Sequence, residues 1–398
     1  MRATSILLFA GALAQAAFAA PTHTKKCVIP TSSGDASEAI VSTFERCKKD
    51  STIVFEKHKV YHVEKPMNIT GLDNVHISLE GTILFSDDMT YWVDNMYLLN
   101  YQSAGTWWFM AGNDIRIDGG GTIDGNAQVW WNAEAKDPRP VALTFENVTG
   151  LEVSDILMTQ VPFWTFLMRD TKNAVFENLR IRSYSNSQHA AHNSDGFDVY
   201  RSENVTIRNS EVINNDDCVS IRANSTNILI ENLYCFGSHG ISVGSLGQYA
   251  RDGEYDFASN IYVHNITCDN CQNGARVKAW NGGTGYVSNV TFDDFEVTYV
   301  DNPIVITTHY CDNNQPDYCN GDETQSLTFK DITFNNVYGF TSDAAEPIIN
   351  INCSSKTPCE NIQLTKINIK PADTTPDNIC VNLSGSDDIS LCSSKSSS

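Results

Sequence analysis

The stretch ENVTIRNSEVI at residues 203–213 joins an asparagine turn to alternating β-branched residues and then to a second short strand. The same pattern returns as TNILIENLYCF at residues 226–236 and as SNIYVHNITC at residues 259–268. Recurrence every few tens of residues, with short strands and almost no helical periodicity, is typical of a solenoid. We therefore predict an all-β, single-domain parallel β-helix in which each repeat forms one coil.

Further copies of the pattern span most of the chain, at residues 73–81, 113–121, 146–156, 172–181, 288–297 and 360–369. An ordinary β-sandwich is the alternative, but a sandwich would show hairpin turns instead of one repeated turn-strand-turn pattern. Residues 36–49, ASEAIVSTFERCKK, carry apolar residues at helical spacing. Because the terminal coil of a solenoid needs covering, we expect this segment to form a short N-terminal capping helix.

Residues 1–19 have the layout of a secretory signal peptide. Arg2 precedes an apolar run at residues 6–13, and small residues follow at Ala17 and Ala19. The apolar run is shorter than the roughly 20 residues that span a bilayer, which disfavours a membrane anchor. We predict a secreted, extracellular protein whose residues 20–398 form one domain, because no linker or charge block interrupts them.

Twelve cysteines in an exported chain indicate an oxidising compartment, where thiols form disulfides. Proximity in sequence suggests five pairs: Cys27 with Cys47, Cys218 with Cys235, Cys311 with Cys319, Cys353 with Cys359, and Cys380 with Cys392. Cys268 and Cys271 form a CxxC, which a redox or zinc site could use. Without a βαβ context or a second CxxC, we predict a local disulfide and no metal.

Acceptors for N-glycosylation fit the same secreted setting, in which glycans occupy exposed turns. They are Asn68, Asn147, Asn204, Asn224, Asn265, Asn289, Asn352 and Asn382. Paired tryptophans are expected to pack in the interior instead of stacking on sugars, since aromatic side chains fill cores. They are Trp107, Trp108, Trp130 and Trp131.

The chain is strongly acidic, with 27 Lys and Arg against 48 Asp and Glu and a formal net charge of −21. Such a charge disfavours nucleic acids and anionic membranes as partners, because phosphate binding needs basic surface. An acidic sugar could bind only where the few cations gather. The candidates for this are Arg276, Lys278, His239 and Arg251.

Three carboxylates follow the coil spacing. Asp195 and Asp216 lie 21 residues apart, about one coil, so both can reach the same face one layer apart. Asp217 is adjacent to Asp216, and both reach a cleft only if the strand bends or ends there. His239 follows Asp217 by 22 residues. Asp198 is expected to do no more than cap a turn.

Clustered carboxylates are what glycosidic cleavage needs. One, kept protonated by its neighbours' negative charge, protonates the leaving oxygen, while another activates water or attacks carbon. Nearby Arg and Lys would hold a sugar carboxylate. A calcium site is the other use of clustered acidic residues, but the nearby cations argue against it.

Four motifs in order carry a family resemblance: Asn193-Ser194-Asp195, Asp216-Asp217, Ser238-His239-Gly240 and Arg276-Val277-Lys278. They are similar to the N-T-D, D-D, G-H-G and R-I-K pattern of the polygalacturonases of glycoside hydrolase family 28. Members are right-handed parallel β-helix enzymes that hydrolyse α-1,4-galacturonan in pectin. The chain differs from the family pattern at positions 194, 238 and 277, but it retains every side chain to which the pattern assigns a chemical role. Tyr310, in PIVITTHY, falls on the family's substrate-contacting tyrosine.

The resemblance implies hydrolysis with inversion, without cofactor or metal. Asp216 would be the general acid, Asp195 and Asp217 would activate water, and His239 would tune the acid. The residues implied in binding galacturonate are Asn193, Arg276, Lys278 and Tyr310.

Segments at residues 237–249 and 275–294 look more like the fungal exo-acting members than the endo-acting ones. The resemblance therefore implies a monomeric exo-polygalacturonase that acts on pectin, polygalacturonic acid and oligogalacturonides from the non-reducing end. Endo action and xylogalacturonan or rhamnogalacturonan cleavage remain alternatives, although His239 counts against the last. A β-helical lyase would need calcium and an Arg base, and a non-catalytic pectin-binding solenoid belongs to another class altogether.

Overall fold

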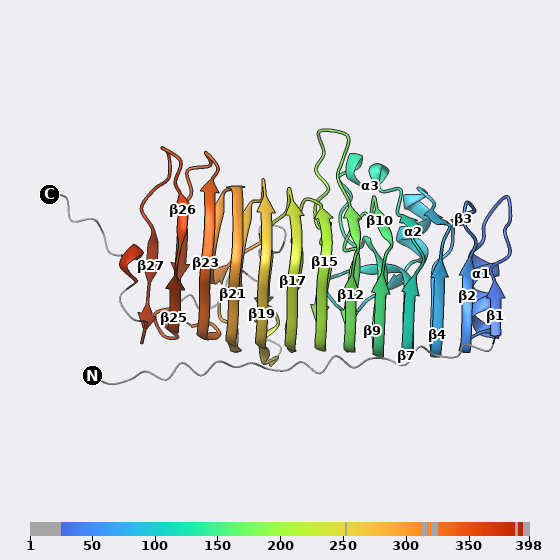
Figure 1. Cartoon of the computed structure of the whole chain (residues 1–398), viewed down its shortest axis with the longest axis horizontal. Coiled ribbons are helices and arrows are strands. Elements are labelled where there is room, and N and C mark those ends of the chain that lie inside the picture. The colour runs from blue at the N-terminus through green and yellow to red at the C-terminus, as the bar shows by residue number, and fades with distance from the viewer. Residues whose placement is uncertain are drawn as a thin grey trace.

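The computed structural model describes residues 25–250, 253–312, 315, 317, 319, 325–386 and 389–392. The chain winds as a right-handed parallel β-helix, and successive coils lie side by side from one end to the other (Figure 1). Among the described strands the pairs are parallel, apart from β6 (Tyr97–Leu98) with β7. The predicted β-helix is confirmed, and the sandwich alternative is wrong because the coils pair without hairpins.

The β-helix consists of three ladders of parallel strands. The long front ladder in Figure 1 contains β1 (Lys25–Val28), β2 (Lys49–Phe55), β4 (Met67–Leu79), β7 (Gly105–Asp118), β9 (Pro140–Ser154), β12 (Lys172–Glu177), β15 (Glu203–Ile213), β17 (Ser225–Phe236), β19 (Asp256–Asp269), β21 (Gly285–Val300), β23 (Thr328–Thr341), β25 (Cys359–Thr365) and β28 (Leu383–Ser384). A second ladder contains β3 (Val60–Val63), β5 (Thr82–Phe85), β8 (Thr122–Asp124), β10 (Leu157–Thr159) and β13 (Arg180–Arg182), and continues in the ends of the long strands, where β26 (Asn368–Lys370) joins β23.

The third ladder starts in the first halves of β4, β7 and β9 and is called here the cleft ladder. It continues through β11 (Phe166–Arg169), β14 (Phe197–Tyr200), β16 (Val219–Ile221), β18 (Ile241–Leu246), β20 (Asn273–Trp280), β22 (Asn302–Tyr310), β24 (Ile349–Asn352) and β27 (Ile379–Val381). Helices are α1 (Ser37–Arg46), α2 (Met89–Asn95) and α3 (Gln128–Asn132), with a 3-10 turn, η3 (Ser390–Cys392).

The core is a set of stacked side chains that repeat from coil to coil. On the cleft ladder, Phe166, Phe197 and Val219 stand in register, and all three are fully buried. Since side chains alternate along a strand, the residues between these core positions must point outward. That alternation decides which side chains the cleft ladder presents to solvent.

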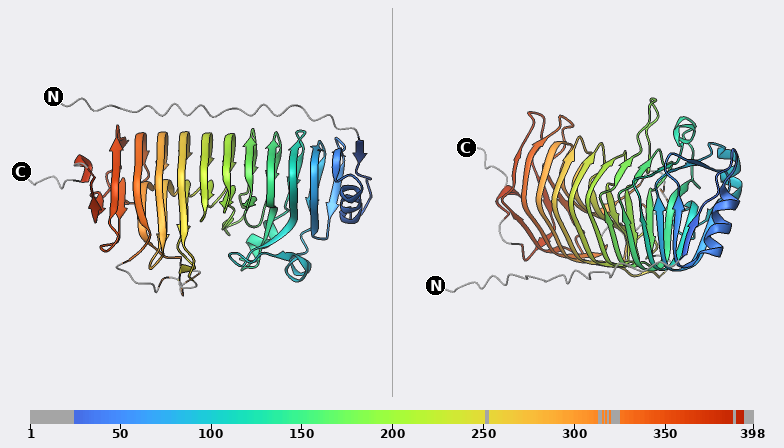
Figure 2. Two further views of the ribbon diagram at one scale, coloured as in Figure 1. Left: turned by 90° about the horizontal axis from the view of Figure 1, so that it is seen from below. Right: turned by 45° about the vertical axis from the view of Figure 1, so that its right-hand side comes forward.

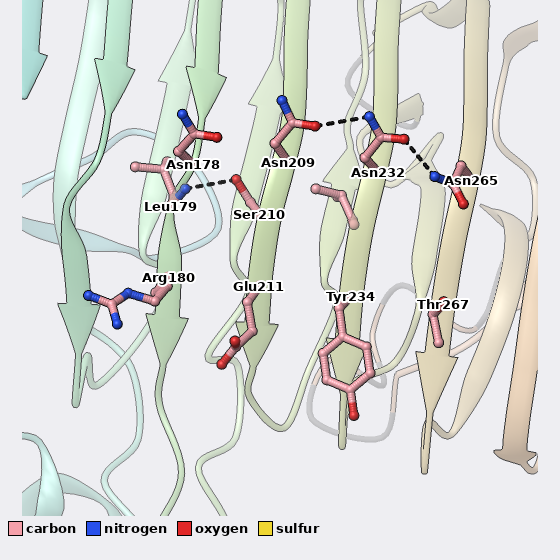
Figure 3. Close-up of a pocket in the computed structure, with 11 residues that line it drawn as sticks. Asn178, Leu179, Arg180, Asn209, Ser210, Glu211, Asn232, Tyr234, Asn265 and Thr267 are labelled. Atoms are coloured by element: carbon pink, nitrogen blue, oxygen red, sulfur yellow. Dashed lines mark hydrogen bonds between the residues drawn. The ribbon is translucent and has the colours of Figure 1, made fainter.

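Asparagines in the left-handed conformation connect the coils at their turns. Asn209, Asn232 and Asn265 have φ between 52° and 57°, a region that asparagine tolerates better than most residues. The Asn232 amide donates to Asn209 at 2.9 Å, and the Asn265 amide donates to Asn232 at 2.7 Å (Figure 3). A second row, called here the asparagine ladder, joins Asn173, Asn204, Asn227, Asn260 and Asn289 in the same way.

Helix α1 covers the N-terminal end of the solenoid, as the dark-blue end of Figure 2 shows. Its buried face includes Ile40 and Phe44, and the Phe44 ring meets Trp108 edge-on at 6.1 Å. The predicted capping helix is therefore confirmed. The predicted signal peptide and the serine-rich residues after Cys392 lie outside the described residues.

Five disulfides join the pairs that proximity suggested, in order along the chain. The predicted disulfide between Cys268 and Cys271 is wrong, because both cysteines are free and buried. Cys268 points inward from β19 and stacks between Cys235 and Val297, while the Cys271 thiol donates to the Cys235 carbonyl at 3.5 Å. Cys268 thus serves as a small apolar side chain of the core.

Six of the eight glycosylation acceptors are exposed, and Asn224 and Asn352 are half-buried. The paired tryptophans are buried, as predicted. No helix in the described part of the chain is long and apolar enough to cross a membrane.

Candidate active site

A cleft of about 1060 Å³ lies over the outward face of the cleft ladder. Asp198 of β14, Ser220 of β16, Ser242 of β18 and Arg276 of β20 stand in register there, each between two inward apolar residues. All four are buried under the surrounding loops, with Arg276 9% exposed. The β alternation therefore places polar side chains in a buried position, where their electrostatic interactions are stronger than in water.

The three predicted carboxylates come from the segments that lead into β14 and β16. The chain bends at Asp216 before β16 begins at Val219, so Asp216 and Asp217 both reach the cleft instead of facing opposite ways. Asp195 precedes β14, and its carbonyl accepts from Thr165 N–H at 2.8 Å. The sequence-based expectation of a bend at the Asp pair is confirmed.

Asp216 lies between His239 and Asn193. Its Oδ1 is 3.2 Å from His239 Nδ1 and accepts from the Asp217 backbone N–H at 2.8 Å, while Oδ2 accepts from the Asn193 N–H at 3.2 Å. Burial raises the pKa of Asp216, but the electrostatic effect and hydrogen bond of His239 and the charge of Lys278 outweigh it. The net pKa is well below the ordinary value.

Asp217 is held by two cations. Arg276 donates to its Oδ1 at 2.6 Å, Lys278 donates to its Oδ2 at 3.0 Å, and the Ser242 hydroxyl donates to Oδ1 at 2.8 Å. Burial opposes ionisation of Asp217, yet Lys278 and Arg276 hold its pKa below the ordinary value. Asp217 is therefore an ionised carboxylate that fixes both cations in the cleft.

Asp195 shares Arg222 with Asp198. Arg222 donates to Asp195 at 3.2 Å and to Asp198 at 2.8 Å, and its guanidinium lies over the Trp164 ring at 5.1 Å. Burial and the neighbouring carboxylates, Asp216 foremost, raise the pKa of Asp195 well above its ordinary value. Burial raises that of Asp198 to about 7, although Arg222 opposes the rise.

One oxygen of Asp195, Oδ1, has no hydrogen-bond partner among the described residues. A buried carboxyl oxygen without a protein partner is a place where a water molecule is held, since buried polar groups are rarely left unsatisfied. Asp195 also lines the cleft. It is therefore suited to bind a water beside the reacting bond.

Arg139 holds the segment that carries Asn193. It donates to the His192 carbonyl at 2.8 Å and to the Asn193 side-chain oxygen at 2.5 Å, and its guanidinium lies 4.6 Å from the Phe163 ring centre. Holding that oxygen turns the Asn193 amide nitrogen towards Asp216, 3.5 Å away. Arg139 thus positions a residue that contacts the carboxylate of Asp216.

Tyr310 closes the cation side of the cleft. Lys278 Nζ lies 5.1 Å from the centre of its ring, and Trp280 meets the same ring edge-on at 5.0 Å. Burial raises the pKa of the Tyr310 hydroxyl, which keeps that group a neutral hydrogen-bond donor. Trp130 and Trp131 are buried and also line the cleft.

The structure brings together every site residue that the sequence predicted. They are Asn193, Asp195, Asp216, Asp217, His239, Arg276, Lys278 and Tyr310. Arg251 lies outside the described residues. Asp198 does not merely cap a turn, because it is fully buried in β14 and paired with Arg222.

Arg139 and Arg222 belong to the site but were not predicted from the sequence. A signal existed for Arg222, which continues the outward alternation of the β16 strand directly after the Asp pair. Arg139 gave no such signal, because it acts across 54 residues of sequence on Asn193. The general acid was expected to have a raised pKa, but the pKa of Asp216 is lowered and that of Asp195 is raised.

Asp216, Asp217 and His239 also form a group of side chains that could ligate a metal ion. One oxygen each of Asp216 and Asp217 and a nitrogen of His239 lie within 4.8 Å of one another. Both oxygens of Asp217, however, accept from Arg276 and Lys278, which repel a cation and occupy the ligand atoms. These contacts fit an anionic ligand better than a metal ion.

Comparisons with known proteins agree with this geometry. Residues 48–393 match the model of glycosyl hydrolases family 28. An exopolygalacturonase from Rhizopus delemar is 37% identical over 94% of both chains, and one from Emericella nidulans is 38% identical over 88% of this chain and 84% of that protein. An endo-xylogalacturonan hydrolase from Aspergillus tubingensis superimposes with TM-score 0.76 and 28% identity, over 90% of this chain and 96% of that one. The chain belongs to the glycosyl hydrolases of family 28.

Proposed function

We propose that this protein is an exo-polygalacturonase, a glycoside hydrolase that removes galacturonate from the non-reducing end of α-1,4-galacturonan. One observation carries the proposal: three carboxylates and a histidine lie in the same cleft as Arg276 and Lys278. Carboxylates suit glycosidic cleavage, and the two cations suit a sugar that bears a carboxylate. The relatives named as exopolygalacturonases, at 37–38% identity over most of the chain, support exo action.

Arg276 and Lys278 are the proposed binding site for the carboxylate of galacturonate. Arg276 and Lys278 are buried and face Asp217, so a galacturonate carboxylate can approach from the open side of the cleft and share their remaining N–H donors. The Tyr310 ring beside Lys278 offers an apolar face and a hydroxyl for the sugar ring. Asn193, on the opposite side of Asp216, supplies a further amide.

Asp216 is the proposed general acid, tuned by His239. In the free enzyme the charges of His239 and Lys278 hold it ionised. A substrate carboxylate on Lys278 adds a negative charge next to Asp216 and weakens that effect, which raises the pKa of Asp216 towards that of a proton donor. Asp216 would then protonate the glycosidic oxygen.

Asp195 and Asp217 are the proposed activators of the attacking water. Asp217 is ionised by its cations, and Asp195 has an oxygen free to accept from water. Attack by this water, without a covalent sugar-enzyme bond, inverts the configuration at the anomeric carbon. Asp195 has a raised pKa in the free enzyme, but it must be ionised to act as a base. We therefore propose that a proton moves from Asp195 to Asp216 when substrate binds.

We also propose that the protein is secreted as a monomer, with residues 1–19 as signal peptide and residues 20–398 as one domain. The five disulfides support export, because such bonds persist in oxidising compartments. Pectin is the natural polymer that would then be reached outside the cell.

The test is product analysis of the purified protein on polygalacturonic acid without added calcium, with Asp216→Asn as the inactive control. We expect galacturonate monomer from the earliest time, a slow fall in viscosity and no ultraviolet-absorbing unsaturated product. Mixed oligomers with a rapid fall in viscosity would make the enzyme endo-acting. Activity confined to xylose-substituted galacturonan would favour the specificity named for the Aspergillus tubingensis enzyme.

A further inference from the structure

An open groove lies beside the second ladder, away from the catalytic cleft. Its volume is about 530 Å³, and among the described residues none lines both the groove and the cleft. Figure 3 shows two rows of side chains in the groove, with one residue of each row in every coil from β13 to β19. The groove therefore runs across the strands, along the axis of the solenoid.

One row of the groove consists of asparagine amides. Asn232 donates to Asn209, and Asn265 donates to Asn232 (Figure 3). An asparagine side chain has two N–H donors and two carbonyl lone pairs, and each of these bonds uses one donor and one lone pair. Asn232 thus keeps one N–H and one lone pair that the row does not use, and both can serve a polar ligand.

The other row leads to a pair of exposed aromatic rings. Its members stand in register and are Arg180, Glu211, Tyr234 and Thr267. Phe236 lies two residues beyond Tyr234 and shares its outward face, since side chains alternate along a strand. Tyr234 is 38% exposed and Phe236 37% exposed. We call these two rings the first platform, an apolar surface that water covers in the free protein.

The same pair of residue types occurs again three coils further along. Tyr338 and Phe340 of β23 stand in register with Tyr234 and Phe236 through the intervening strands β19 and β21. Phe340 is 41% exposed. Because neighbouring strands lie about 4.8 Å apart, three steps put this second platform about 14 Å from the first. A chain of a few sugars along the axis could contact both platforms.

Two carboxylates lie between the platforms. Asp269 of β19 accepts from the Tyr234 hydroxyl at 2.8 Å, and Glu296 of β21 accepts from the Thr267 hydroxyl at 3.3 Å. Within the described part of the chain, neither forms an ion pair. In the catalytic cleft, by contrast, cations hold both oxygens of Asp217. Carboxylates without a cation repel an anionic sugar but accept hydrogen bonds from sugar hydroxyls.

Cations flank these carboxylates without reaching the strands between the platforms. Arg182 bonds Glu211 at 2.9 Å, so each offsets the charge of the other, and Arg180 stands on the same strand β13. At the opposite end, Lys370 of β26 stands in register with Phe340. The centre of this face is therefore anionic and apolar at once, which suits a neutral ligand with many hydroxyls.

We propose that this face is a second saccharide-binding site, and that its occupant is a neutral β-1,4-linked glucan chain. Such a chain is an extended ribbon, with C–H groups on the faces of its rings and hydroxyls along its edges. The rings stack on the two platforms, while the hydroxyls donate to Asp269 and Glu296 and bond the asparagine row. Galacturonan is disfavoured because it bears a carboxylate on every ring. The site goes beyond the proposed function, since it holds the protein on a neutral polymer without taking part in cleavage.

The experiment measures binding of the purified protein to amorphous cellulose, with Tyr234→Ala/Phe236→Ala as the variant. We expect wild type to bind and the Kd of the variant to rise about tenfold, because stacking on the first platform is lost. The kcat and KM on soluble polygalacturonic acid should not change. Tyr262→Ala is the matched control. Tyr262 is 42% exposed on the front ladder and also donates to an aspartate, Asp293 at 2.9 Å, so its loss should leave the Kd unchanged.

The possible outcomes distinguish this occupant from others. Failure of wild type to bind cellulose, or an equal Kd in the variant, would overturn the proposal. A higher KM of the variant for polygalacturonic acid would assign the face to galacturonan. Binding that appears only after removal of N-glycans would make a glycan on Asn265, which lines the groove, the occupant. A wild-type dimer in sedimentation that the variant loses would make it a second copy of this chain.

Two further measurements keep the test decisive. Cellulose binding should hardly change between about 0.05 M and about 0.5 M salt, because a neutral chain carries no charge to screen, and a steep loss with salt would contradict the proposal. If the melting temperature shows that the double variant is unfolded, Phe236→Ala alone decides by the same Kd. Binding is measured without turnover, so an inactive enzyme would refute the proposed function and leave this test intact.

Discussion

The asparagine ladder and the cleft ladder use the same coil repeat for opposite purposes. In the asparagine ladder, neutral amides at exposed turns repeat one hydrogen bond from coil to coil, with donor distances of 2.9–3.1 Å. In the cleft ladder, the residue in register changes along the stack, from Asp198 through Ser220 and Ser242 to Arg276. Identical neighbours stabilise the stack, whereas unlike neighbours create a charged site.

The difference lies in what covers each ladder. The turns of the asparagine ladder are open to water, so charge there would gain little. The cleft ladder lies beneath long loops that bury Asp195 to 2% and Asp217 to 1% exposure. Burial raises the pKa of both carboxylates, and Lys278 and Arg276 lower the pKa of Asp217, so the two values move apart. Burial also makes each unpaired charge costly.

The largest effect on activity is expected at Asp216. Asp216→Asn should lower kcat on polygalacturonic acid by about 10³-fold with little change in KM, because it removes the proposed general acid while the cations remain. An aryl galacturonide with a good leaving group needs no protonation, so the variant should lose far less activity on that substrate. Steady-state kinetics on both substrates make the measurement.

Asp195→Asn provides the contrast, since loss of a base is not rescued by a better leaving group. If the aryl galacturonide restored the activity of Asp195→Asn and not that of Asp216→Asn, then Asp195 would be the general acid and Asp216 the base. Asp269→Asn is the matched control. It removes a carboxylate that accepts from Tyr234 on another face and should leave kcat unchanged.

A smaller loss is expected at Arg276, the cation proposed to bind the substrate carboxylate. Arg276→Lys keeps the charge but cannot bond Ser242 and Asp217 together as the guanidinium does. We expect KM to rise about tenfold and kcat to fall about tenfold. Arg208→Lys, at a solvent-facing pair with Glu177, should change neither constant, and an equal effect of both substitutions would argue against a site-specific role.

The buried carboxyl groups of the cleft should make the stability of the folded protein depend on pH. The pKa of Asp198 is raised from 3.8 to about 7, so its contribution to stability is fully present below pH 3.8 and is lost as the pH rises through 7. The lowered pKa values of Asp216 and Asp217 act in the other direction, with a contribution that is lost below pH 3.8. Melting temperatures should therefore fall by a few degrees between pH 4 and pH 8.

Asp198→Asn tests that origin, because asparagine keeps an acceptor for Arg222 but cannot ionise. The fall in melting temperature above pH 4 should become shallower in this variant. An unchanged slope would assign the pH dependence to other groups.

The smallest effect on activity is expected in the asparagine ladder. Asn227→Ala removes hydrogen bonds to two coils and puts alanine at a φ of 59°. We expect a loss of about 1–3 kcal/mol in unfolding free energy and no change in kcat. Asn227→Gly tolerates the same φ and should lose less, so an equal loss in both would assign the whole effect to hydrogen bonds. Denaturant unfolding and steady-state kinetics provide the two measurements.

Much of the fold follows from local rules. The repeated asparagine turns and alternating strands predict the coils because asparagine tolerates left-handed φ and β-branched residues fill a pleated core. The amphipathic segment before the first coil predicts α1. The CxxC failed as a prediction because the inward orientation of Cys268 depends on its place in the stack, which sequence spacing does not reveal.

The sequence by itself determined the coil repeat and five disulfide pairs, because each follows from a short-range pattern. Coil spacing and charge indicated Asp195, Asp216, Asp217, His239, Arg276 and Lys278, and the family resemblance added Asn193 and Tyr310. Tertiary structure alone decided how those side chains ionise and what encloses them. Arg139 reaches Asn193 across 54 residues, and Gln102 reaches Gln248 across 146. Burial and contacts at such separations depend on how loops fold over the solenoid, and no local pattern encodes them.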